Sequence, residues 1–320
     1  MNIKPVAFLL SALILSAATP AYAVESYIAV EAHTGRVFLA SHSEKKRPVA
    51  SLSKIAMAKV VLDWAQASQT SLAVSAVVPH TAFSFASANP MGIQSGDRIT
   101  LRDALYSSLM GSDNISAHTL ADHVGRALLA HRRLTGDPQK VFVYEMNNLA
   151  KALGMRRTKF TNSHGLDLPR RRSYSTASDM ARLSMHAMRD PGFRFYVKQK
   201  TRTIRIVKSD GKKLSYKVSN TNPLLGQLGV NGIKTGITAA AGECLAVNAN
   251  RKPLVKKISD QRSQIRYRDL IVIVLGSADR VARSKQLINQ SWPMYDQWAA
   301  SGYLLTNKGR ELLRVPELKQ

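Results

Sequence analysis

The chain has 320 residues and a formal net charge of +25, with 46 lysines and arginines against 21 acidic residues. This length suffices for one large domain or two small ones with a substantial core, and the single cysteine, Cys244, excludes an internal disulfide. A basic chain attracts polyanions, but zinc-finger spacing, an RNA-binding signature and a basic zipper are all missing from the sequence. We therefore expect no nucleic-acid partner.

Residues 1–23 have the pattern of a secretory signal peptide. Lys4 precedes an apolar run at 6–18, and the small residues Ala21 and Ala23 flank Tyr22. The run is shorter than the roughly 20 residues that span a bilayer, so we expect cleavage after Ala23, and the loss of Lys4 reduces the charge to +24. The mature protein is expected to be soluble or peripheral outside the cytoplasm, with no transmembrane segment, where envelope polymers and lipid headgroups are the available anions.

The first half of the chain predicts a hairpin followed by helices. Residues 27–40 favour two short strands joined at Gly35. A buried helix begins within 47–65, because the residues after Lys54 are mostly apolar. After loops and short turns to about residue 97, the sequence predicts helices at 100–110, 116–133, 141–155 and 176–188. The tetrapeptide 111–114 is predicted to be the turn between the first two of these helices.

The second half predicts mainly strands. They lie at 201–207, 229–237, 243–249 and 270–276, with a turn at 238–242. A closing helix at 282–300 is expected to be interrupted at Pro293. Strands at both ends with helices between them indicate one mixed α/β (α+β) domain over 24–300, with the helical block inserted into a sheet, and a C-terminal tail at 301–320.

Ser51 and Lys54 are spaced one helical turn apart, so both side chains can lie on one face. A serine hydroxyl becomes nucleophilic when a base takes its proton, and a lysine can act as that base when burial lowers its pKa. Taken alone, the pair is also explained by a serine that caps a helix. The same spacing occurs three times, at Ser43/Lys46, Ser51/Lys54 and Ser209/Lys212, and only the second pair begins a buried helix.

Two further motifs favour the catalytic interpretation. Ser112, Asp113 and Asn114 follow Ser51 after 61 residues, and a K-T-G motif follows 122 residues later. This set is the signature of penicillin-binding proteins and class A β-lactamases. Longer blocks, among them "RPVASLSK", "SGDRITLRDALYSSLMGSDN" and "GIKTGITAAAGECLA", resemble the low-molecular-mass penicillin-binding proteins, the serine D-alanyl-D-alanine peptidases, over about residues 25–290. The "RPVASLSK" block, together with "NTN" at 220–222 and "KTGITAAAGECL", looks most like the murein endopeptidase branch.

The resemblance implies the fold of the serine β-lactamases and D,D-peptidases, an antiparallel sheet flanked by helices with an inserted all-helical subdomain. It also implies an acyl-enzyme on Ser51, with Lys54 as base and Ser112 as proton relay to the leaving amine. The implied substrate-binding residues are Asn114, Lys234, Thr235, Gly236 and Ile237. Lys234 and Thr235 would hold the substrate carboxylate, Gly236 would keep the strand edge open, and the N–H groups of Ser51 and Ile237 would form the oxyanion hole.

The expected partners are peptidoglycan stem peptides and β-lactams, with no cofactor and no metal. His164 is interpreted as part of a structural turn and Glu145 as part of an ordinary helix face. A β-lactamase and a catalytically silent, basic envelope-binding protein are the alternatives, and the choice between carboxypeptidase and endopeptidase stays open. The basic segment 251–268 predicts either a solvated hairpin extension or an electrostatic contact with anionic envelope polymers or membrane.

Overall fold

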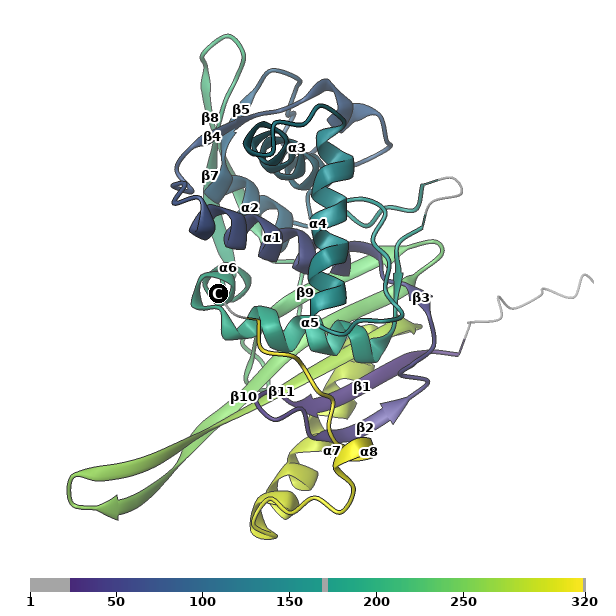
Figure 1. The fold of residues 1–320 in the computed structure, drawn as a ribbon, viewed down its shortest axis with the longest axis vertical. Helices are drawn as coiled ribbons and strands as arrows, with labels where there is room; N and C mark the ends of the chain where they lie inside the picture. Colours follow the sequence, from purple (N-terminus) through teal and green to yellow (C-terminus); the bar gives the residue numbers. More distant parts are fainter. Residues whose placement is uncertain (1–23, 169–171, 319–320) are drawn as a thin grey trace, which may run out of the picture.

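A computed structural model describes residues 24–168 and 172–318, so the predicted signal peptide lies outside the described residues. Its main sheet is five-stranded and antiparallel, in the order β2-β1-β11-β10-β9 (Figure 1). These strands are β1 (Ser26–Glu31), β2 (Val37–Ser41), β9 (Val230–Thr238), β10 (Gly242–Ser259) and β11 (Arg262–Ser277). Ser26 of β1 pairs with Leu275 of β11, which confirms that the sheet takes strands from both halves of the chain.

Alternation along the strands gives the sheet two apolar faces. Ile28 and Ile273 belong to one buried cluster, which includes the helical part of the molecule. Ala29 and Val272 belong to a second cluster, which the aromatic residues of α7 (Arg280–Ala300) complete. Because successive side chains in a strand point to opposite faces, helices cover the sheet on both sides. The helix on the first face is α5 (Ala177–Arg189).

The helical part contains the helices that the sequence predicts, shifted by a few residues. They are α5 and, in addition, α1 (Ser53–Ala67), α2 (Leu101–Met110), α3 (Asn114–His131) and α4 (Pro138–Ala152). The short helix α6 (Pro191–Val197) was not predicted. Thr100 and Asp113 cap α2 and α3 by accepting hydrogen bonds from backbone N–H groups in the first turn. The expected interruption at Pro293 is wrong, because α7 continues through it while Trp292 and Tyr295 hold the helix against the sheet.

The inserted part is not all-helical, which corrects one expectation. It carries a four-stranded sheet in the order β4-β5-β7-β8. Its strands are β4 (Ser75–Val77), β5 (Arg98–Thr100), β7 (Thr201–Val207) and β8 (Lys213–Ser219). β4 and β5 have three residues each, too few to show an alternating pattern, which is why the segment before residue 97 predicted only loops. The remaining short elements are β3 (Arg47–Pro48), β6 (Tyr174–Ser175), and the 3₁₀ turns η1 (Ala50–Leu52) and η2 (His80–Phe83).

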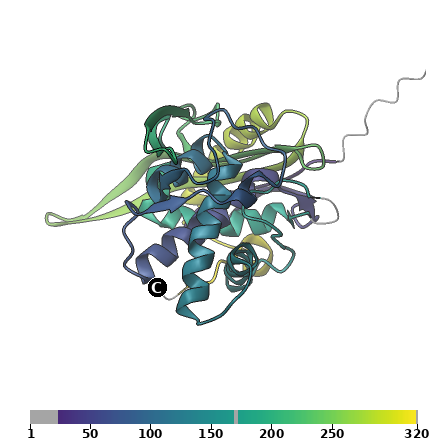
Figure 2. The same cartoon turned by 90° about the horizontal axis from the view of Figure 1, so that it is seen from above.

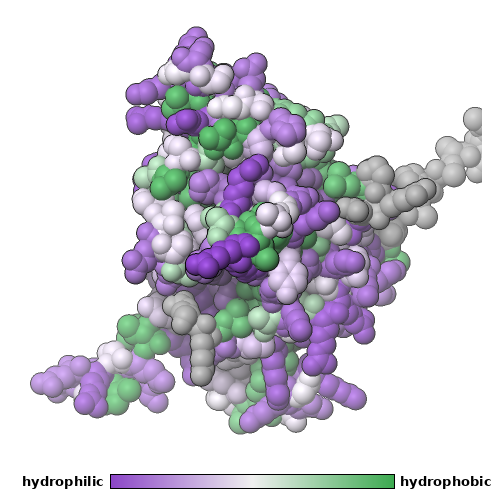
Figure 3. Space-filling model, turned by 45° about the horizontal axis from the view of Figure 1, so that its top comes forward, coloured by the Kyte–Doolittle hydropathy of each residue, from purple (hydrophilic) through white to green (hydrophobic). Residues whose placement is uncertain are grey.

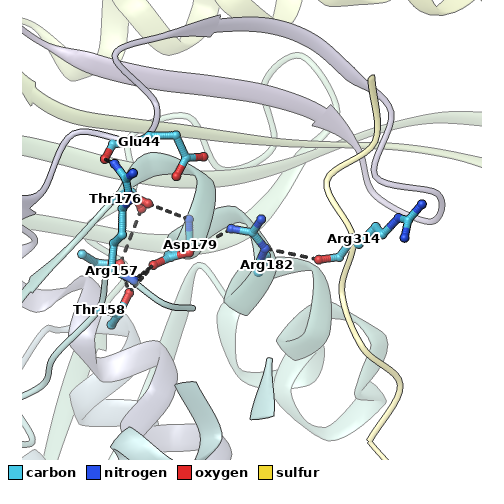
Figure 4. A network of polar contacts seen from close by, with 8 residues as sticks. Glu44, Arg157, Thr158, Thr176, Asp179, Arg182 and Arg314 are labelled. Atoms are coloured by element: carbon cyan, nitrogen blue, oxygen red, sulfur yellow. Dashed lines mark hydrogen bonds and ion pairs between the residues drawn. The ribbon is translucent and has the colours of Figure 1, made fainter. Parts of the chain in front are cut away.

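The predicted tail packs back on the domain after the short helix α8 (Lys308–Glu311). The Leu313 N–H donates to the Gly35 carbonyl at 2.8 Å. Further on, Arg182 of α5 donates to the Arg314 carbonyl at 3.2 Å and forms an ion pair with Asp179 at 2.8 Å (Figure 4). Among the described helices, none combines the length and hydropathy that a membrane span requires.

Candidate active site

The three sequence motifs meet where the helical part contacts β9. Ser51 lies in η1, immediately before α1, and Lys54 lies in the first turn of α1. Asn114 is the first residue of α3, and the K-T-G residues lie on β9, an outer strand of the sheet. The structure therefore joins side chains that are 60 to 183 residues apart in the sequence.

The backbone around Ser51 is held by close packing against two glycines. A Cβ on Gly236 would lie 3.1 Å from the Ser51 nitrogen, and a Cβ on Gly165 would lie 2.0 Å from the Ala50 carbonyl oxygen. Gly165 also has a φ of +85°, and Ala50 itself has a φ of 46°. Glycine is thus the residue that lets β9 and the 162–165 turn approach the serine.

Ser51 and Lys54 are in hydrogen-bond contact, with 3.0 Å between Oγ and Nζ. Nζ also donates to Asn114 Oδ1 at 2.6 Å and to the His164 carbonyl at 2.7 Å. Lys54 is fully buried while Ser51 is half-buried. Burial lowers the pKa of Lys54 to about 7, against the opposing charge of Asp113. A lysine with this pKa is partly neutral near pH 7 and can accept a proton.

The turn between α2 and α3 supplies Asn114 and orients it. Asp113 accepts a hydrogen bond from the Ser116 N–H at 2.7 Å and so caps the start of α3. Ser112 has a φ of 62°, in the left-handed region. Asn114 Nδ2 donates to Ser87 Oγ at 3.0 Å, so its Oδ1 is the atom left to face Lys54.

The K-T-G strand contributes a second buried amine. Lys234 is 1% exposed, and its Nζ donates to the Thr235 carbonyl at 3.0 Å. Burial lowers the pKa of Lys234 well below its usual range, and the charges of Lys54 and Arg280 lower it further. For Lys54, burial is the main cause of the lowered pKa, as the sequence analysis expected.

Four contacts of the site were not foreseen from the sequence. The His164 carbonyl and the Ser87 hydroxyl complete the surroundings of Lys54 and Asn114. Thr221 Oγ1 lies 2.6 Å from Thr235 Oγ1, and Arg280 Nη1 donates to the Gly236 carbonyl at 2.8 Å. Thr221 lies in the "NTN" of a block that carries the family resemblance, and this was the one available signal. The others depend on tertiary packing or on a backbone atom.

His164 and Glu145 have no side-chain contact with Ser51 or Lys54 among the hydrogen bonds and ion pairs of the described residues. The His164 ring packs on Phe85, with 4.3 Å between ring centroids, and burial lowers its pKa well below the usual range, so only its carbonyl reaches Lys54. Glu145 pairs with Arg132 at 2.7 Å. Glu145 and Arg132 line a cavity of about 640 Å³ between α1, α3 and α4. The lining of this cavity does not include Ser51 or Lys54.

The chain is similar in sequence to proteins of known function. The D-alanyl-D-alanine carboxypeptidase family model matches residues 14–259. A D-alanyl-D-alanine carboxypeptidase of Streptomyces is 31% identical over 72% of this chain and 78% of its own length. A D-alanyl-D-alanine endopeptidase of Escherichia coli is 28% identical over 77% of this chain and 74% of its own length. A further Escherichia coli carboxypeptidase, DacC, is 29% identical over 82% of this chain, and the match takes in 59% of its length.

The fold has solved counterparts as well. The crystal structure of a Streptomyces DD-transpeptidase superposes with a TM-score of 0.70 and 27% identity, covering 83% of this chain and 96% of that one. Two of its mutant forms superpose with TM-scores of 0.69 and 0.70 at 27% identity. The family match covers more than half of the chain. The chain therefore belongs to the D-alanyl-D-alanine carboxypeptidase family of serine D,D-peptidases, whose members act on peptidoglycan.

Proposed function

We propose that this protein cleaves the D-Ala-D-Ala type of bond in peptidoglycan stem peptides through an acyl-enzyme on Ser51, and that β-lactams acylate the same serine. The observation that carries the proposal is the pair formed by Ser51 Oγ and the buried Lys54 Nζ, 3.0 Å apart, with a lysine pKa of about 7. A nucleophile beside a base with a perturbed pKa is the arrangement that covalent catalysis needs.

The hydrogen bonds around Lys54 suit a base that changes its protonation state. A neutral amine has two N–H donors and one lone pair. The Asn114 Oδ1 and His164 carbonyl acceptors take both donors, and the lone pair then faces the Ser51 hydroxyl. When Lys54 takes the serine proton, its third N–H has Ser51 Oγ, now bonded to the substrate carbonyl carbon, as acceptor. Neither state leaves a buried donor without a partner.

The proton must then reach the leaving amine. We assign this relay to Ser112, in the turn that also presents Asn114. Attack by Ser51 on the substrate carbonyl forms a tetrahedral intermediate, and its collapse expels the D-alanine amine as that amine accepts the proton. Water hydrolyses the resulting ester and regenerates Ser51. The same steps serve a terminal D-alanine and a D,D-crosslink, because only the leaving amine differs.

β9 is the proposed substrate platform. As an outer strand it has an unpaired edge, along which an extended peptide can lie. Lys234 and Thr235 would bind the substrate carboxylate, with Arg280 adding positive charge nearby. The N–H groups of Ser51 and Ile237 would form the oxyanion hole, each worth on the order of 3 kcal/mol in the transition state. The Ile237 side chain is 61% exposed, so its identity should matter little.

We further propose that residues 1–23 direct export, that 24–300 form the catalytic domain, and that the enzyme works outside the cytoplasm, where its substrate lies. The β-lactamase alternative requires rapid hydrolysis of the acyl-enzyme. A class A β-lactamase uses a glutamate for that step. Glu145 is engaged by Arg132 instead, so we expect a long-lived penicillin adduct.

The test uses two substrates, a pentapeptide muropeptide and a D,D-crosslinked dimer, with Ser51→Ala as the matched control. Mass spectrometry follows the release of D-alanine from the first and of monomers from the second. We expect product from at least one substrate with the wild-type protein and from neither with the variant. Absence of both products, or products that persist with Ser51→Ala, would overturn the proposal. Turnover of penicillin within seconds would replace it with the β-lactamase alternative.

A further inference from the structure

The outer part of the β10–β11 hairpin projects from the body of the protein (Figures 1 and 2). We call residues 252–266 the arm. β9 pairs with β10 as far as Ala249, and beyond that point β10 and β11 form a ribbon of two strands. Residues 251–265 are all exposed. The hairpin extension predicted from the sequence is thus confirmed, while its partner is still to be identified.

The arm exposes apolar side chains to an unusual degree. Among the described residues, sixteen large apolar side chains are exposed, and four of them lie in the arm. They are Leu254, Val255, Ile258 and Ile265, and a fifth, Tyr267, follows the arm directly. Val255 and Ile265 are direct cross-strand partners and are 63% and 54% exposed, and Ile258, near the tip, is 64% exposed. Figure 3 shows hydrophobic side chains interspersed with hydrophilic ones on the projecting segment at the lower left.

The same segment is strongly basic. It carries Lys252, Lys256, Lys257, Arg262 and Arg266 against one acidic residue, Asp260. Asp260 pairs with Lys257 at 2.6 Å. The arm therefore has a formal charge of +4, five basic residues less one acidic residue, on fifteen positions.

The base of the arm is fixed to α7. Arg268 forms an ion pair with Asp296 at 2.6 Å, and the Arg251 guanidinium lies 4.5 Å from the Trp292 ring centroid. The Arg266 guanidinium lies 3.5 Å from the ring centroid of Tyr303, which follows α7. These contacts, together with the β10–β11 pairing, hold the arm in one direction relative to the sheet.

We propose that the arm docks on an anionic lipid surface, with Val255, Ile258 and Ile265 entering the headgroup region and the lysines and arginines contacting lipid phosphates. Basic residues interspersed with apolar ones are the pattern of interfacial membrane binding. An anionic polymer in water would match the charge but leave the apolar side chains exposed. A second copy of the mature chain would bring another charge of +24 toward the first.

Docking through the tip would set the distance between the lipid surface and the catalytic cleft. Cys244, the β10 partner of Gly236 beside Ser51, lies fifteen residues before Ser259 at the tip. At about 3.3 Å per residue this stretch of strand spans roughly 50 Å. The arm would thus hold the serine tens of ångströms from the bilayer, where it can reach a polymer that lies above the lipid.

The test measures co-sedimentation of the purified protein with vesicles of phosphatidylglycerol and phosphatidylcholine in equal parts, and with vesicles of phosphatidylcholine alone. Three variants are compared. One combines Val255→Ser, Ile258→Ser and Ile265→Ser; one combines Lys252→Gln, Lys256→Gln and Lys257→Gln; and the control combines Lys212→Gln, Lys213→Gln and Lys217→Gln in the exposed part of the second sheet. Thermal unfolding of each variant checks that the fold is kept.

We expect binding to the anionic vesicles alone. Each arm lysine removed should weaken it by about fivefold, so the lysine variant, which lacks three of them, should lose binding by roughly a hundredfold. The variant with serine at positions 255, 258 and 265 should bind severalfold more weakly, and the control variant should bind about as well as the wild-type protein. No vesicle binding, or equal binding by arm and control variants, would overturn the proposal. Retention on isolated cell-wall polymer that depends on the lysines, without vesicle binding, would assign the arm to that polymer instead.

Insertion can be detected directly. Cys244 is the one cysteine and is buried, so Ile258→Cys provides a unique accessible thiol for an environment-sensitive dye. We expect a blue shift of dye emission when anionic vesicles are added, and none for the same dye on Lys213→Cys. A blue shift at neither position, with binding intact, would show purely electrostatic contact and contradict the proposed entry of apolar side chains.

Discussion

Asn114→Asp tests directly whether Lys54 is the base. The substitution places a carboxylate in a position where Asn114 Oδ1 now lies 2.6 Å from Lys54 Nζ. An opposite charge at this distance raises a lysine pKa by about 1 to 3 units. Since burial sets the pKa of Lys54 at about 7, the variant should titrate between about pH 8 and 10.

The expected consequence is a shift of the pH profile. In the wild-type protein, acylation requires neutral Lys54, so its rate should fall about tenfold per pH unit below pH 7 and level off above it. A rise of the pKa by 1 to 3 units reduces the neutral fraction at pH 7 from about one half to between roughly 10% and 0.1%. The variant should therefore acylate about 5-fold to 500-fold more slowly at pH 7, and regain rate at alkaline pH.

The assay follows the rate of labelling by a fluorescent penicillin, resolved on a denaturing gel, from about pH 5.5 to 10. The pH at the midpoint of the rate profile is the readout, because loss of the Asn114 amide can also weaken penicillin binding and lower the labelling rate at every pH. Asn148→Asp is the matched control, since Asn148 lies on α4 and lines the separate cavity. A midpoint unchanged by Asn114→Asp, or a wild-type profile that is flat between pH 5.5 and 7, would refute Lys54 as the base.

Three further results are expected. Gly236→Val should slow penicillin acylation at least tenfold, because even its Cβ would lie 3.1 Å from the Ser51 nitrogen. The control variant Gly309→Ala, at an exposed position, should acylate at the wild-type rate. Equal acylation rates for the two variants would disprove this packing constraint. His164→Phe should keep its acylation rate within severalfold, because the backbone carbonyl contacts Lys54; a hundredfold loss would instead implicate the ring. Lys54→Met should change the pH dependence of stability in urea unfolding. Because the pKa of Lys54 in the folded state, about 7, lies below the ordinary 10.5, the unfolded wild-type chain binds more protons between these values. The free energy of unfolding of the wild-type protein should rise relative to that of the variant by up to about 1.4 kcal/mol per pH unit across that interval. If the free energies of both proteins changed with pH in the same way, the burial of a neutral amine would be contradicted.

The sequence located the elements of the site but not their contacts. The apolar run after Lys54 predicted a buried helix, and the turn residues at 111–114 predicted the junction that presents Asn114. Both are confirmed. Ser51, however, lies in a 3₁₀ turn before the helix, and Gly165 and Gly236 hold that turn by packing that is not encoded locally.

Other features could not be predicted for distinct physical reasons. The His164 carbonyl contacts Lys54 through the backbone, and a residue's identity gives no signal of that. Strands of three residues, such as β4 and β5, carry no period. Pro293 suggested a break in the closing helix from local propensity, and the tertiary packing of Trp292 and Tyr295 overrode it.

The most direct test of the central claim is to locate the penicillin adduct. The protein is incubated with benzylpenicillin, digested, and analysed by tandem mass spectrometry, alongside Ser51→Ala. We predict one added penicilloyl group, on the peptide that contains Ser51, with no adduct on the variant. An adduct on another residue, an adduct that persists in Ser51→Ala, or none on the wild-type protein would contradict the account.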